Sequence, residues 1–66
     1  MQITINGESK SVPDAVTVAE LVRILDLKKE RVAVEVNRNI VARREWDGVL
    51  LHPGDRLEIV HFVGGG

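Results

Sequence analysis

Apolar and polar residues alternate at the start of the chain. Ile3 and Ile5 are separated by a polar residue, and this period of two predicts a strand with one buried face. The Asn6-Gly7 pair that follows tolerates positive φ and is a strong signal for a tight β-hairpin. Residues 10–12 would then form the returning strand. Pro13 has no amide to donate, so it ends that strand or lies on an edge of the sheet.

A helical period follows the hairpin. Thr17 and Glu20 have the spacing of a capping box, in which the side chain of each residue bonds to the backbone amide of the other. We therefore expect a helix over residues 18–26. Its core-facing stripe, at positions i, i+3, i+4 and i+7, consists of Val18, Leu21, Val22 and Leu25.

Three further strands are expected in the second half of the chain. Valines at every second position predict one strand over residues 32–36, a short apolar run predicts another over residues 40–42, and the last covers residues 56–63. The order ββαβββ indicates an α+β protein with a mixed sheet of four to five strands packed on one helix. We expect the first and last strands to pair side by side in the centre, because both are apolar and the helix must cross between them.

Length and composition narrow the class of protein. Sixty-six residues indicate one domain, residues 1–66. Nine Lys and Arg residues against ten Asp and Glu residues give a net charge of −1, so we expect no nucleic-acid partner. The absence of any apolar run near the roughly 20 residues of a membrane span, and of a signal-peptide pattern, predicts no membrane partner and a cytoplasmic location. The sequence has no cysteine, which fits a reducing compartment and removes thiol nucleophiles.

The polar residues do not form a catalytic pattern. His52 and His61 lack a third residue at a metal-ligand spacing, so we expect no metal site, no catalytic residue and no enzyme activity. His52 lies in an expected turn and should be solvated. His61 is in phase with the apolar positions of the last strand and should pack in the core. Asp47 and Asp55 lie beside glycines, where Asp usually caps backbone groups. Trp46 should have a packing role.

The last strand also has an apolar pair on its second face. Leu57 and Ile59 should point to the core, which places Val60 and Phe62 on the face away from the helix. So short a chain has no further layer to cover that face. We therefore interpret Val60 and Phe62 as a partner-docking surface.

Three glycines follow the last strand directly. Gly64, Gly65 and Gly66 should make no packing contribution, because glycine has no side chain and the least restricted backbone. Three residues reach about 10 Å at 3.3–3.6 Å per residue. We expect this narrow tail to carry the α-carboxylate of Gly66 into the active site of another protein.

Two segments, together with the ββαβββ order, resemble a known family. Residues 36–46 (VNRNIVARREW) and residues 54–66 (GDRLEIVHFVGGG) are similar to the mid-chain and C-terminal signatures of the ThiS family, the sulfur carriers of thiamine biosynthesis. The order and the terminal Gly-Gly resemble the wider group of ubiquitin-like β-grasp proteins. The similarity covers the whole chain.

The resemblance implies a mechanism and a set of partners. An E1-like adenylyltransferase would use ATP to convert the terminal glycine into an acyl-adenylate, so this chain itself would bind no cofactor. Sulfur from a cysteine desulfurase would displace AMP and leave a thiocarboxylate, which thiazole synthase would consume. On this scheme Gly66 carries the sulfur, Gly65 completes the Gly-Gly motif and Gly64 extends the flexible tail.

Two other functions share this fold and tail. The small subunit of molybdopterin synthase uses the same tail chemistry in a stable complex with a catalytic subunit. A ubiquitin-like modifier would instead form isopeptide bonds with lysines, and conjugates of higher mass would reveal it. A purely structural β-grasp module is the third alternative.

Overall fold

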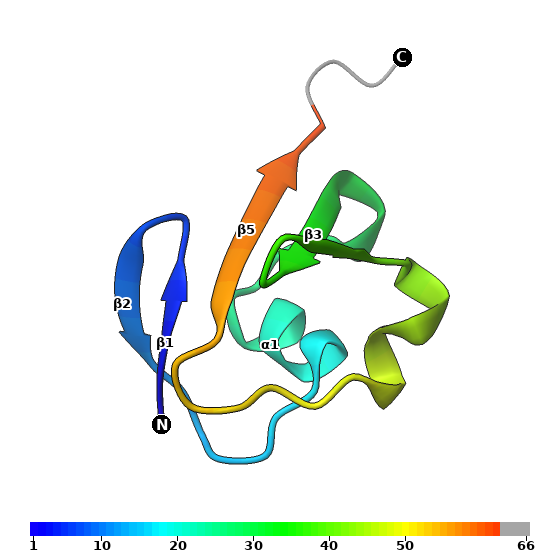
Figure 1. The fold of residues 1–66 in the computed structure, drawn as a ribbon. Coiled ribbons are helices and arrows are strands. Elements are labelled where there is room, and N and C mark those ends of the chain that lie inside the picture. The colour runs from blue at the N-terminus through cyan, green and yellow to red at the C-terminus, as the bar shows by residue number, and fades with distance from the viewer. Residues whose placement is uncertain (63–66) are drawn as a thin grey trace.

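The computed structural model describes residues 1–62, which form one sheet and one main helix (Figure 1). The chain order is ββαβββ with two short 3-10 helices inserted. The elements are β1 (Gln2–Ile5), β2 (Glu8–Ser11), α1 (Val18–Ile24), η1 (Lys29–Arg31), β3 (Val32–Val36), β4 (Asn39–Val41), η2 (Arg43–Gly48) and β5 (Arg56–His61).

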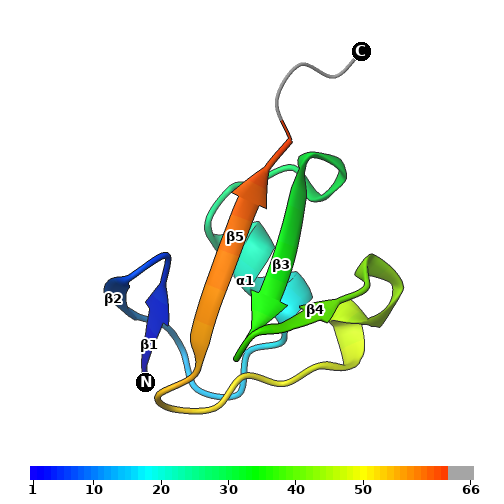
Figure 2. The same cartoon turned by 45° about the horizontal axis from the view of Figure 1, so that its top comes forward.

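The five strands lie in the order β2-β1-β5-β3-β4. The first and last strands, β1 and β5, are parallel neighbours at the centre, and the β1–β2, β3–β4 and β3–β5 pairs are antiparallel. Helix α1 covers one face of this sheet (Figure 2). The predicted architecture and the predicted central pairing are both confirmed.

The predicted capping box forms at the start of α1. The Glu20 amide donates to Thr17 Oγ1 at 3.1 Å, and the Thr17 amide donates to Glu20 Oε1 at 2.8 Å. The hydrogen bond that the Thr17 backbone amide donates to the carboxylate, and after it the Thr17 side chain, holds the pKa of Glu20 below its ordinary value of 4.5.

Helix α1 is shorter than the predicted span of 18–26 because a C-terminal cap ends it at Ile24. Asp26 adopts a left-handed conformation with φ of 58°. Its amide donates to the Arg23 carbonyl at 3.0 Å, and the Leu27 amide donates to the Val22 carbonyl at 3.1 Å. This pair of bonds is the Schellman motif, with aspartate in the position that glycine usually takes.

The first hairpin turns at Asn6-Gly7 as predicted, but its second strand begins earlier than predicted. Asn6 and Gly7 have φ of 50° and 83° and form a two-residue turn, which pairs Ile5 directly with Glu8. The second strand is therefore Glu8–Ser11 rather than residues 10–12, and it is the exposed edge of the sheet. Strand β4 is likewise shifted by one residue from the predicted 40–42.

The core lies between α1 and one face of the sheet. The helix contributes three residues of the predicted stripe, and Leu25 is partly buried beside them. The buried apolar residues are Ile3, Ile5, Val12, Val16, Val18, Leu21, Val22, Val32, Val34, Trp46, Leu51, Leu57 and Ile59. Burial of this set, rather than helix propensity, holds the seven-residue helix in place.

Candidate functional site

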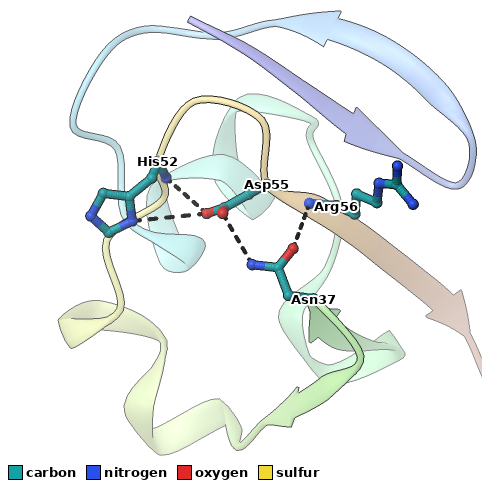
Figure 3. Close-up of polar contacts among 4 residues, drawn as sticks. All are labelled: Asn37, His52, Asp55 and Arg56. Carbon is teal, nitrogen blue, oxygen red and sulfur yellow. Dashed lines mark hydrogen bonds and ion pairs between the residues drawn. The ribbon is translucent and has the colours of Figure 1, made fainter.

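Strand β5 is the element that leads to the end of the chain, and polar contacts fix where it begins (Figure 3). Asp55 accepts from the His52 amide at 2.8 Å and from Asn37 Nδ2 at 3.1 Å. Asn37 Oδ1 accepts from the Arg56 amide at 3.0 Å. The turn before β5 is thereby tied to the β3–β4 turn. The prediction that Asp55 caps backbone groups is confirmed.

A second side-chain amide holds the middle of β5. Asn6 Oδ1 accepts from the Ile59 amide at 2.8 Å, and Asn6 Nδ2 donates to the Ile59 carbonyl at 3.1 Å. Strand β1 has already turned away at this point, since its pairing with β5 ends at Leu57. The Asn6 side chain therefore adds one more rung to the β1 side of β5.

The outer face of β5 carries exposed apolar groups, as the alternation predicts. Val60 is 54% exposed and Phe62 is 53% exposed, and Val60 lies opposite Ala33 of β3. We call Val60 and Phe62 the outer patch. Exposed apolar groups of this size at the last described residues suit contact with another protein.

Ile40 is a further exposed apolar residue on this face. It is 78% exposed and lies opposite Glu35, which in turn lies opposite Glu58 of β5. The short apolar run at residues 40–42 predicts a strand that includes Ile40, but the exposed face of Ile40 was not predicted. The signal was available, because alternation along the β3–β4 hairpin puts Ile40 on the same face as Glu35.

The prediction that His61 packs in the core is wrong. Leu57 and Ile59 are buried on the inner face, but His61, two residues further on, is exposed. Strand β5 runs past the end of the β1–β2 hairpin, and β3 remains beside β5 along this length (Figure 2). His61 therefore lies beyond the covered part of the inner face.

His52 and Trp46 have the structural roles expected of them. His52 is exposed. Trp46 is buried, donates from Nε1 to the Val41 carbonyl at 2.9 Å, and has the Arg43 guanidinium 5.8 Å from its ring centroid.

Within residues 1–62, no three His, Cys, Asp or Glu side chains cluster as a metal site would require. No helix in this part of the chain is long and apolar enough to cross a membrane. Gly64, Gly65 and Gly66 lie outside the described residues.

Comparison with known proteins identifies the family. The family model described as "ThiS family" matches residues 3–66. The chain belongs to the ThiS family. A solved relative, the crystal structure of a thiamine biosynthesis protein (ThiS) from Geobacter metallireducens, is 33% identical, with a TM-score of 0.87 and full coverage of both chains. The resemblance drawn from residues 36–46 and 54–66 is confirmed, as is the β-grasp fold.

ThiS relatives occur at two lengths. The sulfur carrier protein ThiS of Bacillus subtilis is 37% identical over 97% of this chain and 98% of that protein. A thiazole synthase of Magnetococcus marinus is 39% identical over all of this chain, but the chain spans only 20% of that protein. The same domain is thus found both as a small protein named sulfur carrier and as one fifth of a protein named thiazole synthase.

Proposed function

We propose that this chain is a sulfur carrier of thiamine biosynthesis and that the carboxyl group of Gly66 is the atom group that carries the sulfur. The observation that supports this most directly is the match to a sulfur carrier over almost the whole length of both chains. The anchored strand β5, which leads from the sheet toward Gly66, fits the same role.

The chemistry requires an activated acyl group, because a carboxylate is a poor electrophile. An E1-like adenylyltransferase joins the Gly66 carboxylate to the α-phosphate of ATP and releases pyrophosphate. The terminal sulfur of a persulfide, made by a cysteine desulfurase, then attacks the acyl carbon and AMP leaves. A thiol reduces the resulting acyl disulfide to the thiocarboxylate. In this scheme ATP belongs to the activating partner, and the carrier supplies no catalytic group.

The residues of the carrier position the tail and bind the partners. Gly64 and Gly65 have no side chains that would obstruct a narrow channel. Val60 and Phe62, the outer patch, dock on the activating enzyme and on thiazole synthase, so that each partner holds the protein just behind the tail. The Asn37–Asp55 contact and the Asn6–Ile59 pair keep β5 in one position relative to that docking surface.

Thiazole synthase is the proposed acceptor of the sulfur. Support comes from the relative named thiazole synthase, in which a domain similar to this chain makes up a fifth of the protein. The covalent joining of such a domain to a thiazole synthase supports an interaction between this chain and that enzyme.

Mass spectrometry of the intact protein tests the proposal. The chain is incubated with an E1-like adenylyltransferase, ATP, a cysteine desulfurase and cysteine, and the product should carry one sulfur in place of one oxygen at Gly66. Thiazole synthase, supplied with the substrates from which it builds the thiazole ring, should then accept the sulfur and return the chain to its original mass. Lysine-linked conjugates of higher mass would contradict the proposal and favour a protein modifier. A stable complex with molybdopterin synthase and none with thiazole synthase would also contradict it.

A further inference from the structure

Strand β5 has two edges, and residues alternate between them. Two hydrogen bonds show which residues of β5 face β3. The Phe62 amide donates to the Arg31 carbonyl at 2.8 Å, and the Asn37 amide donates to the Arg56 carbonyl at 2.7 Å. Even-numbered residues of β5 therefore bond to β3, and odd-numbered residues direct their amide and carbonyl groups to the β1 side.

The odd-numbered residues find partners only as far as Ile59. The Leu57 carbonyl accepts from the Asn6 amide at 2.9 Å, and Ile59 is paired by the Asn6 side chain. Within residues 1–62, neither the sheet register nor the hydrogen bonds outside it give a partner to the amide or the carbonyl of His61, since the pairing with β1 ends at Leu57 and His61 lies opposite Val32 in a non-hydrogen-bonded pair. The hairpin has turned away at Gly7, and His61 is exposed. One donor and one acceptor therefore face outward at the position where a longer β1 would have continued.

A free strand edge can pair with an extended peptide, and proteins usually protect such edges against unwanted pairing. The edge strand β2 of this sheet follows that rule, since it is short, polar and carries Lys10. The edge at His61 carries no comparable protection from the described residues: its side-chain neighbours in the strand are the exposed Val60 and Phe62. Hydrogen-bonding groups and apolar side chains are thus offered together at the end of β5.

We propose that the enzymes that process the carrier pair an extended segment of their own with β5 at His61. The segment would occupy the place of a longer β1 and exchange two hydrogen bonds with His61, as in a hydrogen-bonded antiparallel pair or its parallel equivalent. This inference rests on the proposed function and names how the partner aligns the tail. Main-chain hydrogen bonds would hold the chain in an extended conformation where it leaves the sheet, whereas the outer patch would supply apolar contact.

A second copy of this chain fits the edge less well than an enzyme segment does. A pair of β5 strands centred on His61 would join two copies through a single residue pair. Stable interfaces bury on the order of 1,200–2,000 Å², far more than one rung and two apolar side chains per copy provide. An enzyme that encloses the tail can supply the remaining area from its own surface.

The alternation gives a sharp mutational test with a matched control. His61→Pro removes an amide that does not bond to β3, so the sheet should keep its pairing and the thermal midpoint should stay near that of the original protein. His61→Ala removes the side chain and keeps the amide. We expect His61→Pro to weaken binding to the adenylyltransferase and to thiazole synthase by at least about tenfold, or 1.4 kcal/mol, and His61→Ala to bind like the original protein.

Amide hydrogen exchange keeps the test independent of the proline variant. In the unmodified protein the His61 amide should exchange rapidly when free and become protected in either complex. Unprotected exchange in the complex, unchanged affinity of a folded His61→Pro variant, or equal losses in both variants would each overturn the edge pairing. A concentration-dependent dimer that protects His61 would overturn the assignment to an enzyme segment. Sulfur loading of the unmodified protein at Gly66 tests the proposed function separately, because it can succeed whichever of these outcomes is found.

Discussion

Asn6 binds the backbone of Ile59 through both ends of its side-chain amide, at 2.8 and 3.1 Å, across 53 residues of sequence. The asparagine is also a turn residue with φ of 50°. One side chain therefore fixes the position of the last strand relative to the first hairpin, and its replacement should affect the protein more than an ordinary turn substitution.

Asn6→Gly isolates this contact, because glycine accepts the positive φ without strain. Loss of two hydrogen bonds, each with a net value of about 0.5–1.5 kcal/mol, should lower the free energy of unfolding by about 1–3 kcal/mol. Urea denaturation measures the change. Arg38→Gly, another residue with positive φ but without a side-chain hydrogen bond among the described residues, is the control and should not destabilise the protein. Equal effects of the two substitutions would refute the role of the Asn6 side chain.

Leu21→Ala should lower the free energy of unfolding by about 2–5 kcal/mol, since Leu21 is fully buried and its loss leaves a cavity. For so small a protein this is a large part of a total of roughly 5–15 kcal/mol. Ile24→Ala on the same helix is the matched control, because Ile24 is 53% exposed and should change stability much less. A midpoint of Leu21→Ala close to that of Ile24→Ala would contradict the observed helix orientation.

Phe62→Ala should weaken binding to the adenylyltransferase and to thiazole synthase by at least about tenfold, or 1.4 kcal/mol, because a few apolar anchors carry most interface energy. Stability should change by no more than about 0.5 kcal/mol at this exposed position. Calorimetric titration and thermal unfolding of the same variant give both quantities. Ile24→Ala, with the same 53% exposure but on α1, should leave affinity unchanged. Retained affinity in Phe62→Ala would remove the outer patch from the docking surface.

Deletion of Gly66, or addition of one residue after it, should abolish sulfur loading and leave the fold intact. The reason is chemical: the proposed adenylate forms on the carboxyl group of Gly66, and a displaced carboxylate would not reach the same reaction centre. Intact-mass analysis after incubation with the partner enzymes and ATP reports loading, and circular dichroism reports the fold. Full loading of the extended chain would disprove the assignment.

The capping box predicts a dependence of stability on acid. Hydrogen bonds from Thr17 lower the pKa of Glu20 below 4.5, so the unfolded chain binds the proton more tightly than the folded one. The contribution of the carboxylate is therefore present above the unfolded pKa and is lost as the pH falls through the lower folded pKa. Glu20→Gln keeps the hydrogen-bonding reach of the side chain and removes its charge. Thermal midpoints measured from neutral pH to well below 4.5 should fall less steeply for this variant than for the original protein.

Local patterns in the sequence were sufficient for much of the fold. The capping box at Thr17, the buried position of Leu21 and the exposed faces of Val60 and Phe62 all follow from spacing alone. The end of α1 did not, because aspartate at position 26 gives no glycine signal for a left-handed cap. The exposure of His61 also escaped prediction, since alternation assigns a face but does not say how far the covering layer extends.

The parts of the site that sequence could not predict depend on contacts between distant segments. Nothing in the Asn6-Gly7 turn signal indicates that the side chain of Asn6 reaches Ile59. The hydrogen bond between Asn37 and Asp55 joins two turns 18 residues apart and likewise requires the assembled sheet. The tail itself, Gly64 to Gly66, was assigned from sequence alone and remains a prediction.

The parallel pairing of β1 with β5 has a consequence for the making of the protein. The first strand synthesised, β1, cannot join the rest of the sheet until the last strand is made, because β5 lies between β1 and β3 and supplies Leu57 and Ile59 to the core. A nascent chain still short of residue 61 lacks the central strand and exposes the apolar groups that this strand should cover, which is the state that proteases and chaperones recognise. The topology thereby acts as a check in biosynthesis, because a polypeptide interrupted before β5 is complete does not fold stably and is removed.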